Sequence, residues 1–332
     1  MKKEEDRLAL LHRVATLFYL EGKHKNEIAR IVKQSTTQVA LLIKEAQQKR
    51  IVEIKVNVPQ FQVLQEKLRS RFHHLRDVIV VPHNRDMKSL LADLSQTAAE
   101  YFDTHVAAGS RVAMGGGYLM YELVNLLTER PRDIDIYAGA IVGRGPTIVH
   151  IDPMVVTTLL WAKSGHMPGR AHYVTVTPMG HTRRAVQDHY RQLVRKKEVT
   201  DLIESLSKLD WLFASLGSLN ADEGYVSATS STTRNLLDEM HFDDAELKRE
   251  GVVGDIVYSF FDENGRGRRT WDLVGSLGLR RLKQMVADPK SRVVVIVGSY
   301  KLQALRAVLR GKLCNVLITD AEAAEKISNE AF

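Results

Sequence analysis

The sequence predicts an α/β protein with a small helical domain at its N-terminus and a large domain built on a parallel sheet. Apolar residues recur at helical spacing over residues 8–46. From residue 77 onward, short apolar strands alternate with helices, which is typical of a parallel sheet. A chain of 332 residues, 44% of them hydrophobic, is long enough for two domains with buried cores.

The first elements are three predicted helices. Residues 8–20 are apolar at helical spacing, and residues 25–32 repeat the pattern. Residues 33–34 form a short polar turn, after which Ser35 is a favourable N-cap for a third helix. The apolar positions of this third helix are Val39, Leu42, Ile43 and Ala46.

Two short helices joined by such a turn are typical of a helix-turn-helix, although an ordinary helical hairpin is the alternative. In a helix-turn-helix the second helix enters the major groove of DNA and places its N-terminal residues at the base edges. Hydroxyl and amide side chains suit base edges, and lysine suits phosphates. The candidate DNA-binding residues are Lys25, Ser35, Thr36, Thr37, Gln38, Leu41 and Lys44.

The charge distribution favours the DNA-binding hypothesis. Residues 1–60 contain twelve lysines and arginines against seven acidic residues, so they account for five of the seven positive charges in the chain's formal net charge of +7. Most of the positive excess therefore lies on less than a fifth of the chain, as expected of a segment that binds a polyanion. We expect double-stranded operator DNA to be that partner.

The next segment is predicted to connect the two domains. Residues 53–58 alternate between apolar and polar, as a half-buried strand does, and Pro59 ends them. Residues 61–74 carry one apolar stripe, so we expect a helix that either packs on the large domain or pairs with its copy in a dimer. The predicted organisation is a helix-turn-helix domain at 1–58, a linker helix at 59–76 and an effector-binding and oligomerisation domain at 77–332.

A glycine turn is the clearest candidate binding site of the large domain. A predicted strand at 111–114 runs into Gly115, Gly116 and Gly117, and a helix at 118–127 follows. Backbone N–H groups at such a helix N-terminus favour a phosphate or a carboxylate. The alternative is that the glycines only let the strand and the helix pack closely.

Other predicted strand ends carry further candidates, because open α/β sheets bind ligands beyond the carboxyl ends of their strands. These candidates are Arg144 after the strand at 134–142, Gly217 after the strand at 209–216, Asp255 after an apolar pair, and Lys301 after the strand at 292–297. Arg144 could instead be a solvated loop charge. Asp255 has no evident structural role in the sequence.

The remaining elements complete the alternation of strands and helices. They are a strand at 77–82, a helix at 87–107, a helix at 153–162 capped by Asp152, a strand at 171–176, a basic helix at 183–197, a turn at 260–265, a helix at 302–310, a strand at 316–319 and a terminal helix capped by Asp320.

Several classes of protein have little support. No stretch approaches a membrane span and the N-terminus lacks the apolar core of a signal peptide, so we expect a cytoplasmic protein with no membrane partner. The single cysteine, Cys314, is expected to be a buried, reduced side chain. Hydrolase, zinc-protease and paired-cysteine motifs are absent and the twelve histidines lack metal-ligand spacing, so no catalytic residue, metal or cofactor is expected.

Four stretches of the chain together resemble a known family. They are the N-terminal helix pair, residues 209–219 (LDWLFASLGSL), residues 251–255 with FFDENGR after them, and residues 293–324. In this order, along nearly the whole chain, they resemble the SorC family of bacterial sugar-responsive transcriptional regulators.

The resemblance implies a winged or helix-turn-helix DNA-binding domain and an effector domain similar to the sugar-phosphate isomerase and CoA-transferase-like fold. Members act as dimers or tetramers, and a phosphorylated sugar alters their affinity for an operator. Carried over by motif, the effector pocket would be lined by Gly115, Gly116, Gly117, Arg144, Gly217, Asp255 and Lys301. Asp255 would accept hydrogen bonds from sugar hydroxyls, and Lys301 would donate to a hydroxyl or a phosphate.

The sequence departs from the family pattern at three places, one of which is Trp271, where a small polar residue is expected. Residues 115–119 replace a Ser-Trp-Gly-x-Thr turn, so two hydroxyl groups are missing. Loss of a buried donor costs about 1–3 kcal/mol, and an effector that is larger or less phosphorylated is therefore an alternative. Ala40 and Leu41 replace a Ser and an Arg on the recognition helix, so base readout would depend on Thr36, Thr37 and Gln38.

The leading hypothesis is a DNA-binding transcriptional regulator controlled by a sugar or phosphorylated sugar effector and working as a homodimer or homotetramer. The alternative is a sugar-phosphate isomerase or transferase-like enzyme with an appended helical domain. In that enzyme Asp255 would be the base and Lys301 the electrophile, but no second carboxylate or nucleophile is predicted at a neighbouring strand end.

Overall fold

The computed structural model describes residues 2–49, 51–52, 59–84, 86–141, 152–174, 182–219, 243–268, 271 and 275–330. The chain divides into two compact units, Met1–Val58 and Pro59–Phe332. The second unit confirms the predicted α/β class with a parallel sheet. The strand predicted at 53–58 lies outside the described residues.

The first unit is a set of packed helices. They are α1 (Lys2–Ala15), which continues into the π-helical turn η1 (Thr16–Leu20), α2 (Lys25–Val32) and α3 (Thr36–Gln48). Their apolar faces meet in one core that contains Leu11, Val14, Ile28, Val39 and Leu42. The first helix begins at Lys2 rather than at the predicted Leu8.

The turn between α2 and α3 is defined by a capping box. Ser35 Oγ accepts the N–H of Gln38 at 3.1 Å, and Gln38 Oε1 accepts the N–H of Ser35 at 3.3 Å. Lys33 adopts the left-handed conformation, with φ of 53°, and its N–H closes α2 on the carbonyl of Ala29. The predicted Ser35 N-cap is therefore confirmed, and its two hydrogen bonds satisfy N–H groups that a helix start leaves open.

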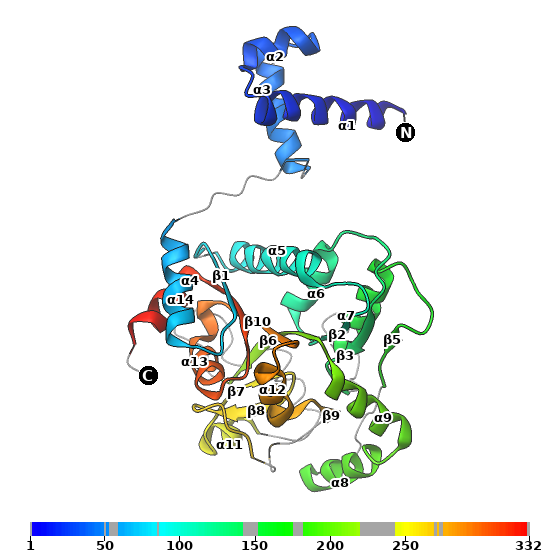
Figure 1. Ribbon diagram of the computed structural model, residues 1–332, viewed down its shortest axis with the longest axis vertical. Coiled ribbons are helices and arrows are strands. Elements are labelled where there is room, and N and C mark those ends of the chain that lie inside the picture. Colours follow the sequence, from blue (N-terminus) through cyan, green and yellow to red (C-terminus); the bar gives the residue numbers. More distant parts are fainter. Residues whose placement is uncertain are drawn as a thin grey trace. The chain divides into compact units, whose positions relative to one another are not determined.

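The second unit is built on a parallel sheet (Figure 1). Its strands in spatial order are β1 (Asp77–Val81), β11 (Val316–Asp320), β10 (Arg292–Ile296), β6 (Trp211–Ser218), β2 (Arg111–Met114), β3 (Asp135–Ala138) and β5 (Ala171–His172). Each neighbouring pair in this order is parallel. All of these strands therefore present their carboxyl ends at the same edge.

Helices cover both faces of this sheet (Figure 1). One face is covered by α5 (Met87–His105), α6 (Tyr118–Leu126) and α7 (Pro153–Lys163). The core on the other face includes residues of α4 (Pro59–Arg71), α8 (Arg183–Leu193), α9 (Lys197–Ser205), α11 (Asp244–Arg249), α12 (Gly278–Ala287), α13 (Leu302–Gly311) and α14 (Ala321–Asn329). A strand between two helical layers must be apolar on both sides, as the run of valines at 293–295 in β10 shows.

The helix expected to link the domains packs on the second unit. Leu64 and Leu68 of α4 are buried against the core beside β1, and Phe72 joins them. Arg71 donates to the carbonyls of Ile327 and Ser328 at 3.0 and 2.9 Å, which holds the end of α14 against α4. Of the two arrangements considered for this helix, the structure shows packing on the large domain.

Two predicted elements are interrupted in the structure. The strand predicted at 134–142 ends at Ala138, although the N–H of Gly139 still donates to the carbonyl of Met114 in β2 at 2.8 Å. The chain then forms β4 (Ala140–Ile141), which pairs with β9 (Gly275–Ser276) outside the main sheet. The basic helix predicted at 183–197 is instead two helices, α8 and α9, with a turn between them.

The burial of α4 leads to a stability prediction. Leu68→Ala should lower the free energy of unfolding of the second unit by about 2–5 kcal/mol, because Leu68 is fully buried and truncation leaves a cavity. Val63→Ala on the same helix is the matched control, because Val63 is 51% exposed. Urea unfolding would measure the free energy of unfolding of both variants. A loss in Leu68→Ala no larger than that in Val63→Ala would show that the buried face of α4 does not stabilise the unit.

Candidate functional site

The sheet has a topological switch point between β2 and β6. β6 lies between β2 and β10 in the sheet. From β2 the chain passes through α6 to β3, on the side away from β6. From β10 it passes through α13 to β11, which lies in the opposite direction across the sheet. The helices α6 and α13 lie on opposite faces. Open α/β sheets bind ligands at the carboxyl ends of the strands where the order reverses.

The glycine turn lies at this switch point. The N–H of Gly115 donates to the carbonyl of Phe213 in β6 at 2.8 Å, and Ser215 Oγ lies 3.4 Å from the carbonyl oxygen of Gly116. Gly117 is the N-cap of α6 with φ of 107°, a conformation that favours glycine. A Cβ at Gly117 would also lie 3.1 Å from Ser215 Oγ. The same turn can therefore both allow close packing against β6 and present a helix N-terminus to an anion.

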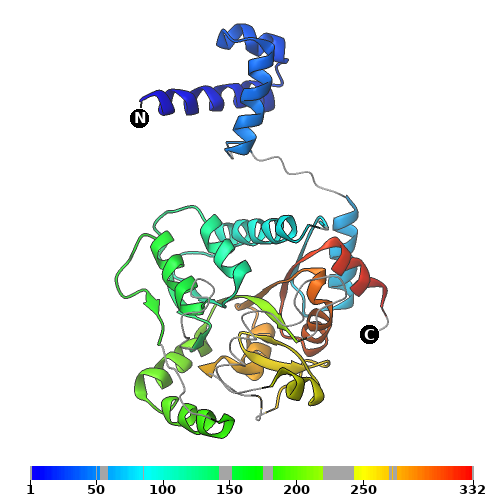
Figure 2. The ribbon, with the colours of Figure 1, turned by 180° about the vertical axis from the view of Figure 1, so that it is seen from behind.

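A β-hairpin, β7 (Val252–Ile256) with β8 (Ser259–Asp262), extends the sheet beside the end of β6 (Figure 2). The prediction that this strand ends at 216, before Gly217, is wrong, because β6 continues through Ser218 and pairs Gly217 with Asp255. The lack of side chains permits this pairing: a Cβ on Gly254 would lie 2.5 Å from the Gly217 carbonyl oxygen. The turn predicted at 260–265 is also displaced, because 260–262 belong to β8.

Asp255 has a structural role that the sequence did not reveal. The hairpin turns at Val257 and Tyr258, which both adopt positive φ, 49° and 59°. This conformation is unusual for a β-branched residue. Asp255 Oδ2 accepts the N–H of Tyr258 at 3.0 Å and so braces the turn. The interpretation of Asp255 as a carboxylate without a structural role is therefore corrected.

Lys301 lies in the 3-10 turn η5 (Ser299–Lys301) and meets the same strand end. Its ammonium group donates to the carbonyl of Leu216, the residue before Gly217. Burial lowers the pKa of Lys301 to about 8, and the neighbouring Asp255 carboxylate opposes this shift. The structure thus brings Lys301 and Asp255 together at the end of β6.

Six of the seven predicted effector residues therefore gather around one strand end. The three glycines contact β6 from the β2 side, Gly217 lies within β6, Asp255 pairs across from it, and Lys301 reaches it from β10. Arg144 lies outside the described residues. Together the gathered groups offer a carboxylate, an ammonium group and a helix N-terminus.

The predicted DNA-binding residues are all exposed on the first unit. Thr36 Oγ1 donates to Asn26 Oδ1 at 3.0 Å, and the Gln38 side chain is engaged in the capping box. Lys25 Nζ lies 5.9 Å above the ring of Phe18. Thr37, Leu41 and Lys44 also project from α3, and Leu41 is 60% exposed.

A basic hollow of about 1030 Å³ lies in the second unit. Arg71, Arg76 and Lys283 line it, together with the C-terminal end of α13. It adjoins the C-terminal ends of α12 and α13, which precede β10 and β11, and therefore the edge of the sheet opposite the glycine turn. Arg76 donates to the carbonyls of Asp288 and Pro289 at 2.8 and 2.6 Å, so part of this basic lining stabilises the end of α12.

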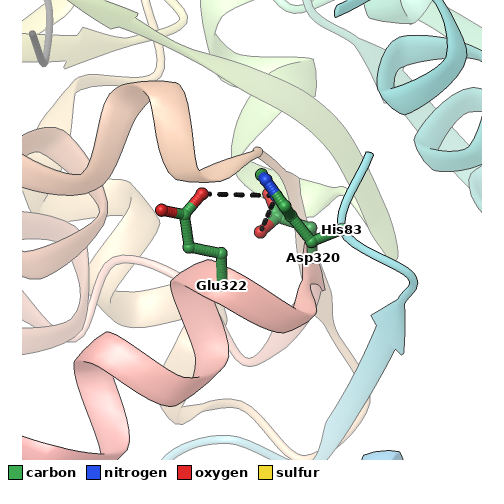
Figure 3. A group of neighbouring side chains, drawn as sticks. All are labelled: His83, Asp320 and Glu322. Atoms are coloured by element: carbon green, nitrogen blue, oxygen red, sulfur yellow. Dashed lines mark ion pairs between the residues drawn. The ribbon is translucent and has the colours of Figure 1, made fainter. Parts of the chain in front are cut away.

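One cluster was missed by the sequence analysis. His83 follows β1, Asp320 ends β11 and Glu322 lies in the first turn of α14, and their side chains converge (Figure 3). The sequence identifies Asp320 as a helix cap, which is confirmed by its acceptance of the Ala323 N–H at 3.0 Å. Its approach to His83 has no signal in the sequence, because the two residues meet only when β1 pairs with β11.

Comparison with known proteins agrees with this architecture. Residues 58–329 match the family described as "Putative sugar-binding domain". The chain is 23% identical over 335 residues to the deoxyribonucleoside regulator of Bacillus subtilis (strain 168), covering 99% of this chain and 100% of that protein. It is 22% identical over 331 residues to the sorbitol operon regulator of Klebsiella pneumoniae, covering 97% and 98%.

Solved structures show the same fold. The full-length sorbitol operon regulator SorC from Klebsiella pneumoniae superposes with a TM-score of 0.73 at 19% identity, covering 97% of this chain and 98% of that one. A transcriptional regulator from Streptococcus pneumoniae TIGR4 gives a TM-score of 0.66 at 18% identity, covering 81% and 97%. Among the described residues, no helix is long and apolar enough to cross a bilayer.

These findings confirm the resemblance to SorC-type proteins that the sequence motifs indicated. The family match spans most of the chain and contains every residue gathered around the end of β6. The chain belongs to the family of sugar-binding domains.

Proposed function

We propose that this protein is a transcriptional regulator that binds operator DNA through residues 1–58 and is controlled by a sugar or sugar phosphate bound at the carboxyl ends of β2 and β6. The observation that carries the proposal is the convergence of the glycine turn, Asp255 and Lys301 at the switch point of a sugar-binding domain. Relatives named as operon and deoxyribonucleoside regulators match nearly the whole chain, including the first unit. We further propose a cytoplasmic homodimer or homotetramer.

The chemistry of the site suits a polyhydroxylated anion. A carboxylate such as Asp255 accepts hydrogen bonds from hydroxyl groups, and a lysine ammonium donates to hydroxyl or phosphate oxygens. The start of α6 has no side-chain cap, so its first N–H groups can face an anion. A protonated Lys301 adds a positive charge within the same group of residues.

On the first unit, the helix-turn-helix assignment is supported by the capping box and by the exposed N-terminal turn of α3. Base readout then depends most on Thr37, because the side chains of Thr36 and Gln38 already have partners within the unit. Leu41 would meet a thymine methyl, and Lys44 a phosphate.

The enzymatic alternative would use Asp255 as a base and Lys301 as an electrophile. The lowered pKa of Lys301 beside a carboxylate is the observation that favours it. The hydrogen bond from the Tyr258 N–H to Asp255 gives that carboxylate a structural explanation instead. Turnover of a pentose or hexose phosphate that disappears in Asp255→Asn would revive the alternative.

The proposed function predicts salt-dependent binding to the protein's own promoter DNA. Fluorescence anisotropy across a salt series should show affinity that falls steeply as salt rises, because phosphate contacts release counterions. A thermal-shift screen of sugars and sugar phosphates should reveal at least one compound that raises the melting temperature and alters DNA affinity. Absence of promoter binding under all of these conditions would refute the proposal.

Two substitutions on α3 should separate sequence reading from phosphate contact. Thr37→Val should change which operator variants are preferred, because it removes a hydroxyl from the base-reading turn. Lys44→Ala should weaken all sequences similarly and reduce the salt slope by about 1. Binding to an operator library would measure both. An unchanged preference in Thr37→Val would contradict the placement of that residue.

Lys301 should control the effector response and its dependence on pH. Below pH 8 Lys301 is mostly charged, and its charge is lost as the pH rises through about 8, so affinity for an anionic effector should fall across that range. Lys301→Met should lose about 10–100-fold in affinity, as expected for a hydrogen bond to a charged group, and should lose this pH dependence. Calorimetric titration from pH 6.5 to 9.5 would measure both effects.

Exposed Lys283→Met is the matched control for Lys301→Met and should behave like the wild type. Operator binding by the unliganded Lys301→Met protein should be nearly intact. Equal loss of operator binding and effector binding would show that Lys301 supports the fold rather than the effector.

A further inference from the structure

The cluster of His83, Asp320 and Glu322 lies at the carboxyl edge of the sheet, where β1 pairs with β11 (Figure 3). The parallel register places Val81 opposite Asp320, so His83 follows two residues beyond that pair. Glu322 lies in the first turn of α14, directly after β11. The edge that carries the proposed effector site thus carries a second group of convergent side chains.

The two distances from His83 to the carboxylates match those between neighbouring ligands of one metal ion. His83 Nδ1 lies 3.5 Å from Asp320 Oδ1 and 3.3 Å from Glu322 Oε2. One ligand atom from each residue can be chosen so that all three lie within 4.8 Å of one another. Tetrahedral zinc with ligand bonds of about 2.0–2.2 Å separates neighbouring ligand atoms by about 3.3–3.6 Å.

Donors outside the cluster hold both carboxylates. Asp320 Oδ2 accepts the N–H of Ser299 at 2.6 Å, and Glu322 Oε1 pairs with Lys326 Nζ at 2.9 Å. The remaining oxygens, Oδ1 and Oε2, are those nearest His83. Oδ1 also accepts the Ala323 N–H, which leaves its second lone pair for another partner. Such outer contacts are typical of carboxylates that bind metals.

Two buried polar atoms at the cluster make no ordinary hydrogen bond. Among the described residues, His83 Nδ1 and Ser299 Oγ are buried and make no hydrogen bond of ordinary geometry. Ser299 is 3% exposed, and its backbone N–H donates to Asp320 Oδ2 at 2.6 Å, so this residue lies beside the cluster. Native proteins rarely leave such groups unsatisfied, and an ion is one common reason.

We propose that His83, Asp320 and Glu322 bind one divalent transition-metal ion of the zinc or manganese class. An imidazole with two carboxylates suits these ions, whereas Mg²⁺ and Ca²⁺ prefer oxygen ligands alone. Two carboxylates neutralise the charge of the ion, and water or a bound ligand completes its coordination. The alternative is that His83 pairs with both carboxylates without a metal.

The site also has a structural connection to the proposed effector pocket. Ser299, which holds Asp320 through its N–H, begins the turn η5, and Lys301 ends that turn. Metal bound at His83 would therefore lie at the other end of the short element that presents Lys301. The metal proposal does not depend on the effector proposal, because its test requires neither a sugar nor DNA.

The test uses the full-length chain without an affinity tag, stripped of metals with a chelator and dialysed. Isothermal titration with Zn²⁺, Mn²⁺ and Mg²⁺ should show one Zn²⁺ or Mn²⁺ ion per chain at this site, bound more tightly than Mg²⁺. His83→Ala and Glu322→Gln should each weaken Zn²⁺ binding at least about tenfold, because loss of even an outer contact costs about 10–100-fold. Asp320 is left intact because it caps α14.

Matched controls distinguish the site from other surface ligands. Glu325→Gln, exposed on the same helix, and His73→Ala, an exposed histidine elsewhere in the second unit, should bind Zn²⁺ as the wild type does. Zn²⁺ should raise the melting temperature of the wild type but not of Glu322→Gln. No Zn²⁺ or Mn²⁺ binding by the wild type, unchanged binding by folded His83→Ala and Glu322→Gln, or a preference for Mg²⁺ would each overturn the proposal.

Discussion

The parallel pairing of β2 with β6 is the constraint on which the second unit depends. Because the strand order reverses between them, α6 and α13 leave the sheet on opposite faces, and the carboxyl ends of β2 and β6 are not crossed by either connection. The glycine turn binds directly to β6 through the Gly115 N–H. Residues from β2, β6 and β10 can therefore approach the same point although they are far apart in the chain.

The second requirement at this point is that the backbones of β6 and β7 approach closely, which a side chain at Gly254 would prevent. Gly254 lets the β7–β8 hairpin add to β6, and the hairpin brings Asp255 toward Lys301. Asp255 in turn accepts the N–H of Tyr258 in a turn with two left-handed residues. A buried carboxylate is costly unless it has such partners, so the bracing hydrogen bond and the nearby ammonium group help to explain why it is tolerated here. Asp255 and Lys301 thus link the local fold to the proposed effector chemistry.

Local signals predicted much of the fold. Ser35, Asp152 and Asp320 were expected to begin helices, and each accepts a backbone N–H in the first turn of its helix. The glycine turn between β2 and α6 was also located correctly. These features depend on residues only a few positions apart. The turn at Val257 and Tyr258 was not predicted, because neither residue carries the turn chemistry of glycine or asparagine and the conformation is supported by Asp255 and by packing.

The sequence by itself determined the α/β class, most strand and helix positions and the candidate residues of the effector site. The spacing of apolar residues, the helix caps and the glycine turns that predicted them are local properties of the chain. Only the tertiary structure decided that Gly217 lies inside a strand, that α4 packs on the second unit and that His83 meets Asp320 and Glu322. Each of these depends on which strands and helices become neighbours. Pairing between distant segments is selected by burial of whole faces rather than by any short motif, so it becomes visible only when the chain is folded.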